Sequence, residues 1–443
     1  MIPLKVLLIQ PSESLVVGKK KSRGSIMPPL GLLNLAAVLR EKVPNITIDI
    51  ADYEIKSEDS DPIFSNYDII GLTGTTVHIP HAVKLIKRIR VENIDACIVM
   101  GGAHATFCHE ELLKTIPELD AVFRGEGENS IVDFVNNYKG RKHLPIIVGV
   151  STRDNISDKL AYAVSDLDTL PDPAYDLINL GKYQLSTHRK ALPLPFASIM
   201  TSRGCPFQCS YCQTPNMFGN KIRYRSPDRI ALEIKKLIDT QKIKSVVFWD
   251  DTFTSSKEHI NALCDKIMDF DIRWMCNTRV ECVSLDMLVR MKKAGCQVIF
   301  YGVESSHQDT LFLLNRTTKK IDIINAFSWT RQIGIQSVAT LMIGAPSDDF
   351  KRIEENVTFI KSLEPDHAYI SIYNAVPGSK EFQRAKIMGL IDEDIDWTNP
   401  KYFLDSPYGL PTVNEQLNRF QLQMAQKYAY RQFYGKEGDT QYE

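Results

Sequence analysis

The chain has 443 residues, of which 44% are hydrophobic and 24% charged, a composition typical of folded globular proteins that excludes wholesale disorder and collagen-like repeats. The 53 Lys and Arg residues nearly balance the 54 Asp and Glu residues, for a formal charge of -1, so no global basic field favours a nucleic acid as a partner. Apolar runs stay far shorter than the roughly 20 residues that span a bilayer, and no signal-peptide cleavage site follows the first of them, so we expect a cytoplasmic chain without a transmembrane segment.

Residues 1–145 alternate short apolar runs with helical stretches. Each run is rich in Val, Ile or Leu and mostly free of charge, as strands covered on both faces should be. The predicted strands are 5–10, 47–51, 68–73, 96–100 and 121–124. Glycines follow several of these strands, so the pattern predicts a doubly wound parallel sheet that binds its ligand at the carboxyl ends of the strands.

A second series of strands and helices follows a linker, residues 146–194. Prolines and acidic residues disfavour a regular helix in the linker, and interspersed apolar residues predict that it packs against the domains. The next predicted strands, within residues 195–400, are 197–201, 245–249, 272–276, 297–303, 337–343 and 368–373. Six such units predict a (β/α)6 partial TIM barrel. Residues 401–443 form a polar and aromatic tail with one predicted helix, 414–434.

Three of the nine cysteines stand close together after the first strand of the second series: Cys205, Cys209 and Cys212. An odd total in a long chain of this type argues against a disulfide framework. A structural zinc site usually takes four ligands in two separated pairs, and no second pair stands at a suitable spacing. Three thiolates in one loop suit a [4Fe–4S] cluster with one iron left open to an external ligand.

This loop resembles that of the radical S-adenosylmethionine (SAM) superfamily, which reads C-x3-C-x2-C with an aromatic residue before the last cysteine, here Tyr211. The resemblance extends along the predicted barrel and implies SAM-binding residues near the strand ends. The segment with Glu304 is similar to the family's ribose contact, and the segment after it to its adenine support. Either of two adjacent aspartates would pair with the SAM ammonium group, and Arg279 would hold a carboxylate. The SAM-binding candidates are Tyr211, Asp250, Asp251, Arg279, Glu304, Ile343 and Gly344. A surface charge or helix cap remains the alternative for each charged residue.

The order of a first α/β domain, an acidic linker and the cysteine loop resembles the cobalamin (B12)-binding radical SAM proteins, whose first domain is flavodoxin-like. The matching stretches are 27–32, 101–106 and 124–128. The resemblance implies that cobalamin lies on backbone and apolar groups at the edge of the first sheet. The candidate contacts are Pro29, Leu30, Gly31, Gly71, Gly74, Gly101, Gly102, His104, Gly125 and Gly127.

The Asp-x-His-x-x-Gly motif, which supplies the cobalt-ligating histidine in cobalamin mutases and methionine synthase, does not occur in this sequence. Four histidines lie in or near predicted loops of the first domain: His78, His81, His104 and His109. Each is either a cobalt ligand or only a hydrogen-bonding residue. The resembling family often holds cobalamin without a protein histidine, and we expect the same here.

The resemblance implies a cobalamin-dependent methyltransferase that acts on an unactivated carbon through a 5′-deoxyadenosyl radical and methylcobalamin. The alternatives are a radical oxidative cyclase or ring-rearranging enzyme of the magnesium-protoporphyrin ester cyclase type, and a cobalamin sensor or carrier. We expect a small-molecule or lipid-like substrate and an external electron donor of the flavodoxin or ferredoxin type. The sequence assigns no residue to the substrate chemistry itself.

Overall fold

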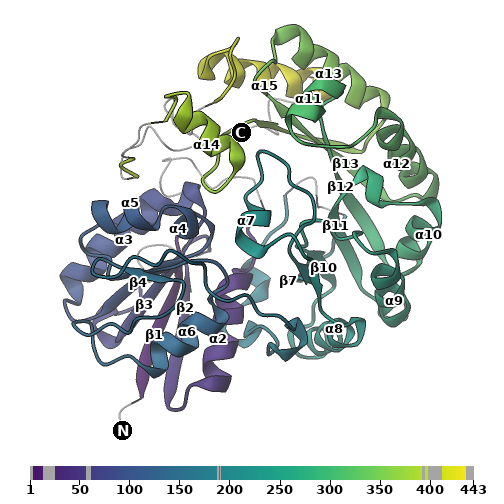
Figure 1. The fold of residues 1–443 in the computed structure, drawn as a ribbon. Helices are drawn as coiled ribbons and strands as arrows, with labels where there is room; N and C mark the ends of the chain where they lie inside the picture. Colours follow the sequence, from purple (N-terminus) through teal and green to yellow (C-terminus); the bar gives the residue numbers. More distant parts are fainter. Residues whose placement is uncertain are drawn as a thin grey trace.

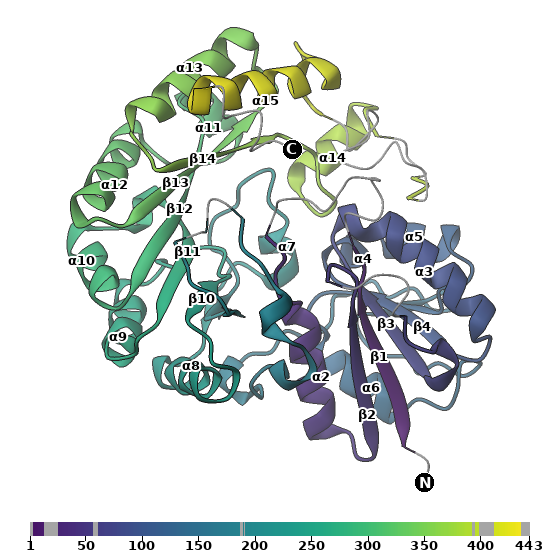
Figure 2. The same cartoon turned by 180° about the vertical axis from the view of Figure 1, so that it is seen from behind.

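The computed structural model describes residues 3–12, 25–55, 61–186, 189, 191–391, 395–397 and 412–435. Two α/β units lie side by side, the first formed by the N-terminal part of the chain and the second by the remainder (Figure 1). Short helix α7 (Thr214–Phe218) lies between them in both views (Figures 1 and 2). The two predicted α/β domains are therefore present and adjacent.

The first unit is a six-stranded sheet with the order β2-β1-β3-β4-β5-β6. Its strands are β1 (Leu4–Gln10), β2 (Ile46–Asp52), β3 (Ile69–Thr73), β4 (Cys97–Gly101), β5 (Ala121–Phe123) and β6 (Val150–Thr152). Strands β1 to β5 pair in parallel, in the flavodoxin-like order that the resemblance implies. Strand β6 is an addition, because it comes from the stretch predicted as linker and pairs antiparallel with β5.

Helices cover both faces of this sheet, as its largely apolar strands require. Helices α2 (Leu30–Lys42) and α6 (Gly127–Asn136) pack on one face. Helices α3 (Ile79–Glu92), α4 (Ala103–Phe107) and α5 (His109–Thr115) pack on the other. Helix α2 lies on the side that faces the second unit (Figure 1).

The second unit is a six-stranded, all-parallel sheet with the order β14-β13-β12-β11-β10-β7. Its strands are β7 (Phe196–Ile199), β10 (Ser245–Phe248), β11 (Arg273–Arg279), β12 (Cys296–Glu304), β13 (Gln336–Ile343) and β14 (His367–Ile372). Sequential neighbours pair throughout, and no pairing of β7 with β14 occurs in the described part of the chain. The predicted (β/α)6 partial barrel is confirmed.

Helices surround this sheet in the predicted alternation. They are α8 (Pro227–Gln241), α9 (Lys257–Ile267), α10 (Leu285–Lys293), α11 (Gln308–Leu313), α12 (Lys320–Ile333), α13 (Phe350–Ser362) and α15 (Arg419–Tyr434). Helix α14 (Lys380–Ile387) instead packs its buried side chains into the core that α3 and α5 form on the first sheet. Ser226 caps α8 by accepting a hydrogen bond from the Arg229 backbone N–H at 3.3 Å, and Pro227 occupies the first turn. The sequence signals therefore set the start of α8.

Helix α15, which the sequence places in the tail, completes the open edge of the barrel. Edge strand β14 exposes backbone groups that would otherwise be unpaired. The Tyr430 hydroxyl accepts from the Ile370 N–H at 2.9 Å, and the Tyr434 hydroxyl accepts from the Ala368 N–H at 2.8 Å. Gln426 donates to the Ile370 carbonyl at 2.7 Å. These side chains take the place of a seventh strand.

The linker packs against both units, as its apolar residues predict. Tyr175 is buried and donates to the Ser198 carbonyl of the barrel. Tyr183 is also buried and donates to Asp52 of the first sheet at 2.8 Å. The linker therefore ties the two units together through buried hydroxyls.

Replacing Asp52 with Asn should change the pH dependence of stability. Burial raises the pKa of Asp52 from 3.8 to about 6, so its stabilising contribution is full only below pH 3.8 and is lost as pH rises from there through 6. The asparagine variant should therefore gain up to about 3 kcal/mol relative to the native chain between pH 4 and pH 8. Urea unfolding at the two pH values measures this difference, and a pH-independent difference would contradict the prediction.

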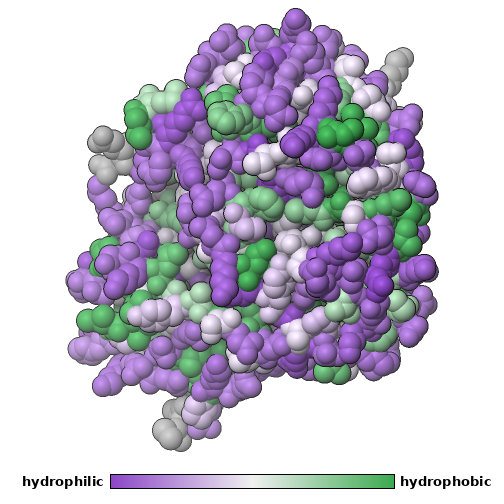
Figure 3. Space-filling view, turned by 45° about the vertical axis from the view of Figure 1, so that its right-hand side comes forward, coloured by the Kyte–Doolittle hydropathy of each residue, from purple (hydrophilic) through white to green (hydrophobic). Residues whose placement is uncertain are grey.

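No helix in the described ranges is both long and apolar enough to cross a membrane. On the face drawn in Figure 3, hydrophilic residues cover most of the surface and hydrophobic residues form separate groups.

Candidate active site between the two units

The three clustered cysteines lie in a loop that a short antiparallel ribbon closes. The ribbon consists of β8 (Ser202–Arg203) and β9 (Arg223–Tyr224). Gly204 follows β8 with a φ of 96°, and a Cβ atom there would lie 2.5 Å from the Lys221 carbonyl oxygen. Only glycine allows this close approach, so the loop begins at a fixed point beside the barrel edge.

Each of the three sulfur atoms has a polar neighbour. The Arg279 Nη1 donates to Cys209 Sγ at 3.2 Å, and the Thr214 backbone N–H donates to Cys212 Sγ at 3.4 Å. Cys205 Sγ lies 3.9 Å from Thr252 Oγ1. Hydrogen bonds of this kind tune cluster thiolates.

The three cysteine sulfur atoms are ligands of the kind that an iron–sulfur cluster requires. All three cysteines are free, and burial raises the pKa of the Cys205 and Cys212 thiols. Only the thiolate form of cysteine ligates a metal. The positive charge of a bound metal group would therefore stabilise the thiolates against the effect of burial. Within the described ranges, no three His, Cys, Asp or Glu side chains converge as on a single metal ion.

Asp250 and Asp251, which the sequence leaves equivalent, differ in the structure. Asp250 is buried and accepts from Thr201 Oγ1 at 2.7 Å, from Ser202 Oγ at 2.5 Å and from the Thr201 N–H at 3.1 Å. It joins the end of β7 to the end of β10. Asp251 is exposed, and its one hydrogen bond among the described residues comes from Thr214 Oγ1 at 2.9 Å. Asp251 is therefore the carboxylate with capacity for a ligand.

Glu304 ends β12 in a strained conformation beside the cysteine loop. Its φ is 65°, a left-handed value that residues other than glycine adopt uncommonly. Its Oε1 accepts from Arg316 Nη1 at 3.3 Å and from the Tyr211 hydroxyl at 3.5 Å. Burial raises the pKa of Glu304 and the Arg316 guanidinium opposes this effect. The structure thus brings Tyr211 and Glu304 together around Arg316, a residue that the sequence analysis missed.

Arg279 ends β11, and its charge is already paired. Its Nε donates to Glu281 at 2.7 Å, and its Cζ lies 3.9 Å from the Phe207 ring centroid. With the contact to Cys209, these interactions hold the cysteine loop against the barrel. The structure therefore places Arg279 beside the sulfur atom of Cys209. The carboxylate that it holds is that of Glu281, a residue of this chain.

Ile343 and Gly344 stand at the end of β13, but neither is open to a ligand. Ile343 is fully buried. Gly344 has a φ of 84°, and a Cβ atom there would lie 2.8 Å from a Leu422 methyl group of α15. Glycine at this position therefore makes room for the tail helix.

A cavity of about 400 Å³ lies between the first sheet and the barrel. Seven predicted cobalamin contacts line it: Leu30, Gly31, Gly71, Gly101, Gly102, Gly125 and Gly127. The barrel side contributes residues that the sequence analysis did not connect with this ligand: Met200, Arg203, Met217, Phe218 and Trp249. The site is thus shared by both units.

Glycines shape the wall of this cavity. A Cβ atom at Gly71 would lie 3.2 Å from a Leu8 methyl group, and one at Gly102, whose φ is 93°, would lie 2.7 Å from Thr73 Oγ1. The rest of the wall is mainly apolar, with Val99, Phe123 and Ile131 among its residues. Bare backbone beside apolar side chains fits a large, flat macrocycle such as a corrin, so the residues present fit cobalamin.

Pro29, Gly74 and His104, which are also predicted cobalamin contacts, are not among the residues that line this cavity. His104 lies in α4 rather than in a loop, and its ring packs edge-on at 4.4 Å from Trp397. Its Nδ1 is 3.1 Å from Thr76 Oγ1, and burial lowers its pKa to about 3. The ring is held in a core formed with a distant part of the chain. His78, His81 and His109 do not line the cavity either.

A buried ion-pair cluster joins the two units at the cavity. Arg203 of β8 donates to Glu126 at 2.8 Å and to Glu128 at 2.6 Å, and Arg223 also pairs with Glu126. Burial disfavours the ionised form of Glu128, but Arg203 outweighs this effect and lowers the pKa of Glu128. Because Arg203 is two residues before Cys205, the cluster also connects the cavity to the cysteine loop.

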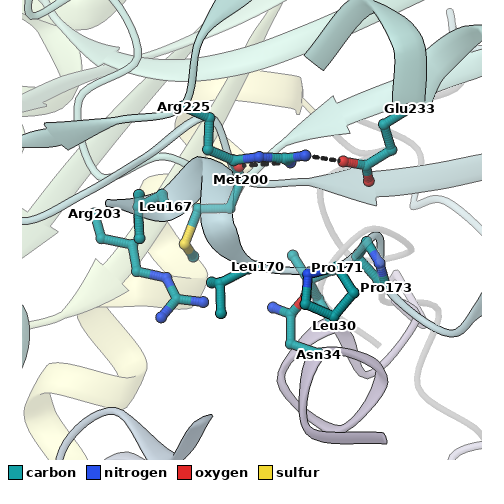
Figure 4. A pocket seen from close by; sticks show the side chains of 10 residues that line it. All are labelled: Leu30, Asn34, Leu167, Leu170, Pro171, Pro173, Met200, Arg203, Arg225 and Glu233. Carbon is teal, nitrogen blue, oxygen red and sulfur yellow. Dashed lines mark hydrogen bonds and ion pairs between the residues drawn. The ribbon is translucent and has the colours of Figure 1, made fainter. Parts of the chain in front are cut away.

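The linker seals the junction beside these residues. A void of only about 20 Å³ remains between linker residues, helix α2 and the barrel. Figure 4 shows its lining side chains, with Leu167, Leu170, Pro171 and Pro173 from the linker. Arg225 pairs there with Glu233 at 2.5 Å, inside the barrel unit. The two units therefore meet through a packed and charged interface.

Comparisons with known proteins match both units. Residues 199–360 match the model of the Radical SAM superfamily, and residues 20–135 match the model of the B12 binding domain. An uncharacterized methyltransferase of Pyrococcus horikoshii, PH0819, is 31% identical over 390 residues, which cover 86% of this chain and 83% of the relative.

Two further similarities extend the comparison. The anaerobic magnesium-protoporphyrin IX monomethyl ester cyclase of Cereibacter sphaeroides is 27% identical over 84% of this chain, which spans 60% of the cyclase. The structure of the radical SAM methyltransferase TsrM from Kitasatospora setae, with cobalamin and a [4Fe–4S] cluster bound, has the same fold. It aligns with a TM-score of 0.68 and 17% identity, over 99% of this chain and 86% of TsrM.

Proposed function

The chain belongs to the cobalamin-binding radical SAM enzymes, and from that premise we propose that it transfers a methyl group from SAM, by way of cobalamin, to an unactivated carbon. The observation that carries this proposal is the shared cavity, which both units line and which Arg203 connects to the cysteine loop. A methyl carrier held there would lie beside the residues proposed for SAM.

The residues of this chain hold two cofactors in the proposed enzyme. When bound, a [4Fe–4S] cluster supplies the electron that cleaves SAM, and cobalamin carries the methyl group. Cys205, Cys209 and Cys212 would ligate the cluster, with Arg279 and the Thr214 N–H donating to the sulfur atoms. The glycines and apolar side chains of the cavity would hold the corrin and exclude water from it.

SAM itself would be oriented by two carboxylates. Asp251 has free acceptor capacity for the ammonium group, whereas the Asp250 carboxylate is occupied by Thr201 and Ser202. Glu304 would accept from the ribose hydroxyls while Arg316 holds its carboxylate in place. These assignments extend the predictions made from the sequence.

Replacing Glu304 with Gln should weaken SAM binding roughly 10- to 100-fold without changing the iron content. An ionised carboxylate makes charge-assisted hydrogen bonds worth about 1.5–3 kcal/mol each, and a neutral amide does not. Equilibrium dialysis with SAM measures the affinity, and iron analysis serves as the internal control. Unaltered affinity would assign Glu304 a purely structural role.

A radical cyclase is the second candidate, because the cyclase relative matches most of this chain. We propose in addition a small-molecule or lipid-like substrate and an external electron donor of the flavodoxin or ferredoxin type. The test is incubation of the reduced, cobalamin-loaded enzyme with tetrapyrrole, lipid and peptide fractions and methyl-labelled SAM. A labelled organic product supports methylation, whereas an unlabelled product with a new ring would support cyclisation.

A further inference from the structure

Arg189 of the linker reaches the inner face of the barrel. Its Cζ lies 4.7 Å from the centroid of the Phe300 ring of β12 and 5.8 Å from that of Trp249, which follows β10. Tyr301 packs outward against Phe327 of α12. Because side chains alternate along a strand, Phe300 points inward. Glu304 ends the same strand, and its Oε1 would lie 2.8 Å from a Cβ atom placed on Gly302, the next residue of the inward face.

One edge of the Arg189 guanidinium has no partner among the described residues. Nη1 donates to Ser25 Oγ at 3.0 Å and lies 3.5 Å from Ser186 Oγ. Nε is buried without a hydrogen-bond partner, and Nη2 makes no hydrogen bond within the described ranges. Nε and Nη2 carry the two parallel N–H groups that bind a carboxylate or phosphate in a bidentate manner.

Arg189 differs in this respect from the other arginines of the site. Arg203, Arg225, Arg279 and Arg316 each have a carboxylate partner. In the described part of the chain, no carboxylate lies within ion-pair distance of Arg189, and burial lowers its pKa. A largely desolvated charge without a counter-ion is costly, and none of the described residues supplies the negative group that this site calls for.

We propose that the Nε and Nη2 edge of Arg189 binds an oxyanion of the substrate, either a carboxylate or a phosphoryl group, with Phe300 and Trp249 against its apolar part. This inference rests on the proposed function, because it names the class of substrate for that site. Trp249 also lines the cavity proposed for cobalamin. An anion held at Arg189 therefore places the rest of the substrate between that cavity and the residues proposed for SAM.

The test is calorimetric titration of the cobalamin-loaded, cluster-containing holoenzyme, saturated with SAM, using three probes of similar shape. Benzoate and phenyl phosphate carry the two candidate anions, and benzamide is the neutral control. At least one anion should bind at a single site, roughly 10- to 100-fold more tightly than benzamide. Arg189→Met should remove this preference, and Arg189→Lys, which keeps the charge but loses the planar fork, should retain part of it.

The matched control is Arg273→Met, because Arg273 is exposed at the start of β11; this variant should bind the probes like the native enzyme. Equal binding of benzoate, phenyl phosphate and benzamide by the native enzyme would overturn the inference. So would an anion preference that survives in Arg189→Met. If Arg189→Met does not fold, an undiminished preference in Arg189→Lys has the same meaning. Failure of the proposed function would instead appear as absence of SAM cleavage by the native holoenzyme.

Discussion

Replacing Cys205, Cys209 and Cys212 together with alanine should abolish both the iron–sulfur absorbance of the anaerobically reconstituted protein and its cleavage of SAM. Without thiolates no ligand remains in this loop to hold iron. Each sulfur also has a neighbour placed to stabilise it, such as Arg279 at Cys209. Absorbance spectra, iron analysis and 5′-deoxyadenosine formation measure the loss.

Cys264 and Cys296 provide the control for the triple variant. Both are buried in the barrel core, and neither belongs to the loop. Alanine there should leave the iron content unchanged and cost only the stability lost by opening a small cavity. Full iron content in the triple variant would show that the cluster is bound elsewhere.

Replacing Arg203 with Met should destabilise the protein by about 3–5 kcal/mol and weaken cobalamin binding. The substitution leaves a buried carboxylate without its counter-ion, because Glu128 has no other ion-pair partner in the described ranges, whereas Glu126 keeps Arg223. Arg203 lowers the pKa of Glu128, so the stabilisation is present above the unfolded pKa of about 4.3 and is lost as pH falls below it. The deficit measured by urea unfolding should therefore be larger at pH 7.5 than at pH 3.5.

Arg225→Met is the control that distinguishes a general loss of stability from a loss of the contact between the two units. Arg225 pairs with Glu233 at 2.5 Å, and both residues belong to the barrel unit. This variant should lose a similar amount of stability while keeping its cobalamin affinity, because its ion pair does not join the two units. Equal cobalamin affinity in both arginine variants would contradict the proposed role of the buried cluster. Adding Glu128→Gln to Arg203→Met should restore part of the lost stability.

Strands buried on both faces could be predicted closely from the sequence, because burial leaves a continuous apolar run. The run 245–249 corresponds to β10 (Ser245–Phe248), and 337–343 to β13 (Gln336–Ile343). Strand β6 (Val150–Thr152) was missed because it is three residues long and pairs antiparallel at the edge of the sheet. So short a run, within a stretch predicted as a proline-containing linker, has no periodicity from which to recognise it.

The candidate site was predictable only as far as local motifs reach. The cysteine spacing and the glycines after the strands are local, and these residues come together in the structure. The Arg203–Glu128 pair joins residues 75 positions apart, so no spacing rule reveals it. In the same way, the sequence does not show that the hydroxyls of Thr201 and Ser202 bind Asp250 and leave Asp251 as the carboxylate for a ligand. His104 stands in a loop-like stretch of sequence, and its burial depends on Trp397, which the fold brings in from the far end of the chain.

The most direct test of the methyltransferase assignment is the fate of the SAM methyl group on the protein. The full-length, cluster-containing protein is loaded with cobalamin, reduced and given methyl-labelled SAM, and its corrinoid is then separated and counted. Our account predicts label in the corrinoid of the native protein, and much less in Arg203→Met at the same cobalamin concentration. A corrinoid free of label, with all of the label in SAM and methionine, would contradict the assignment.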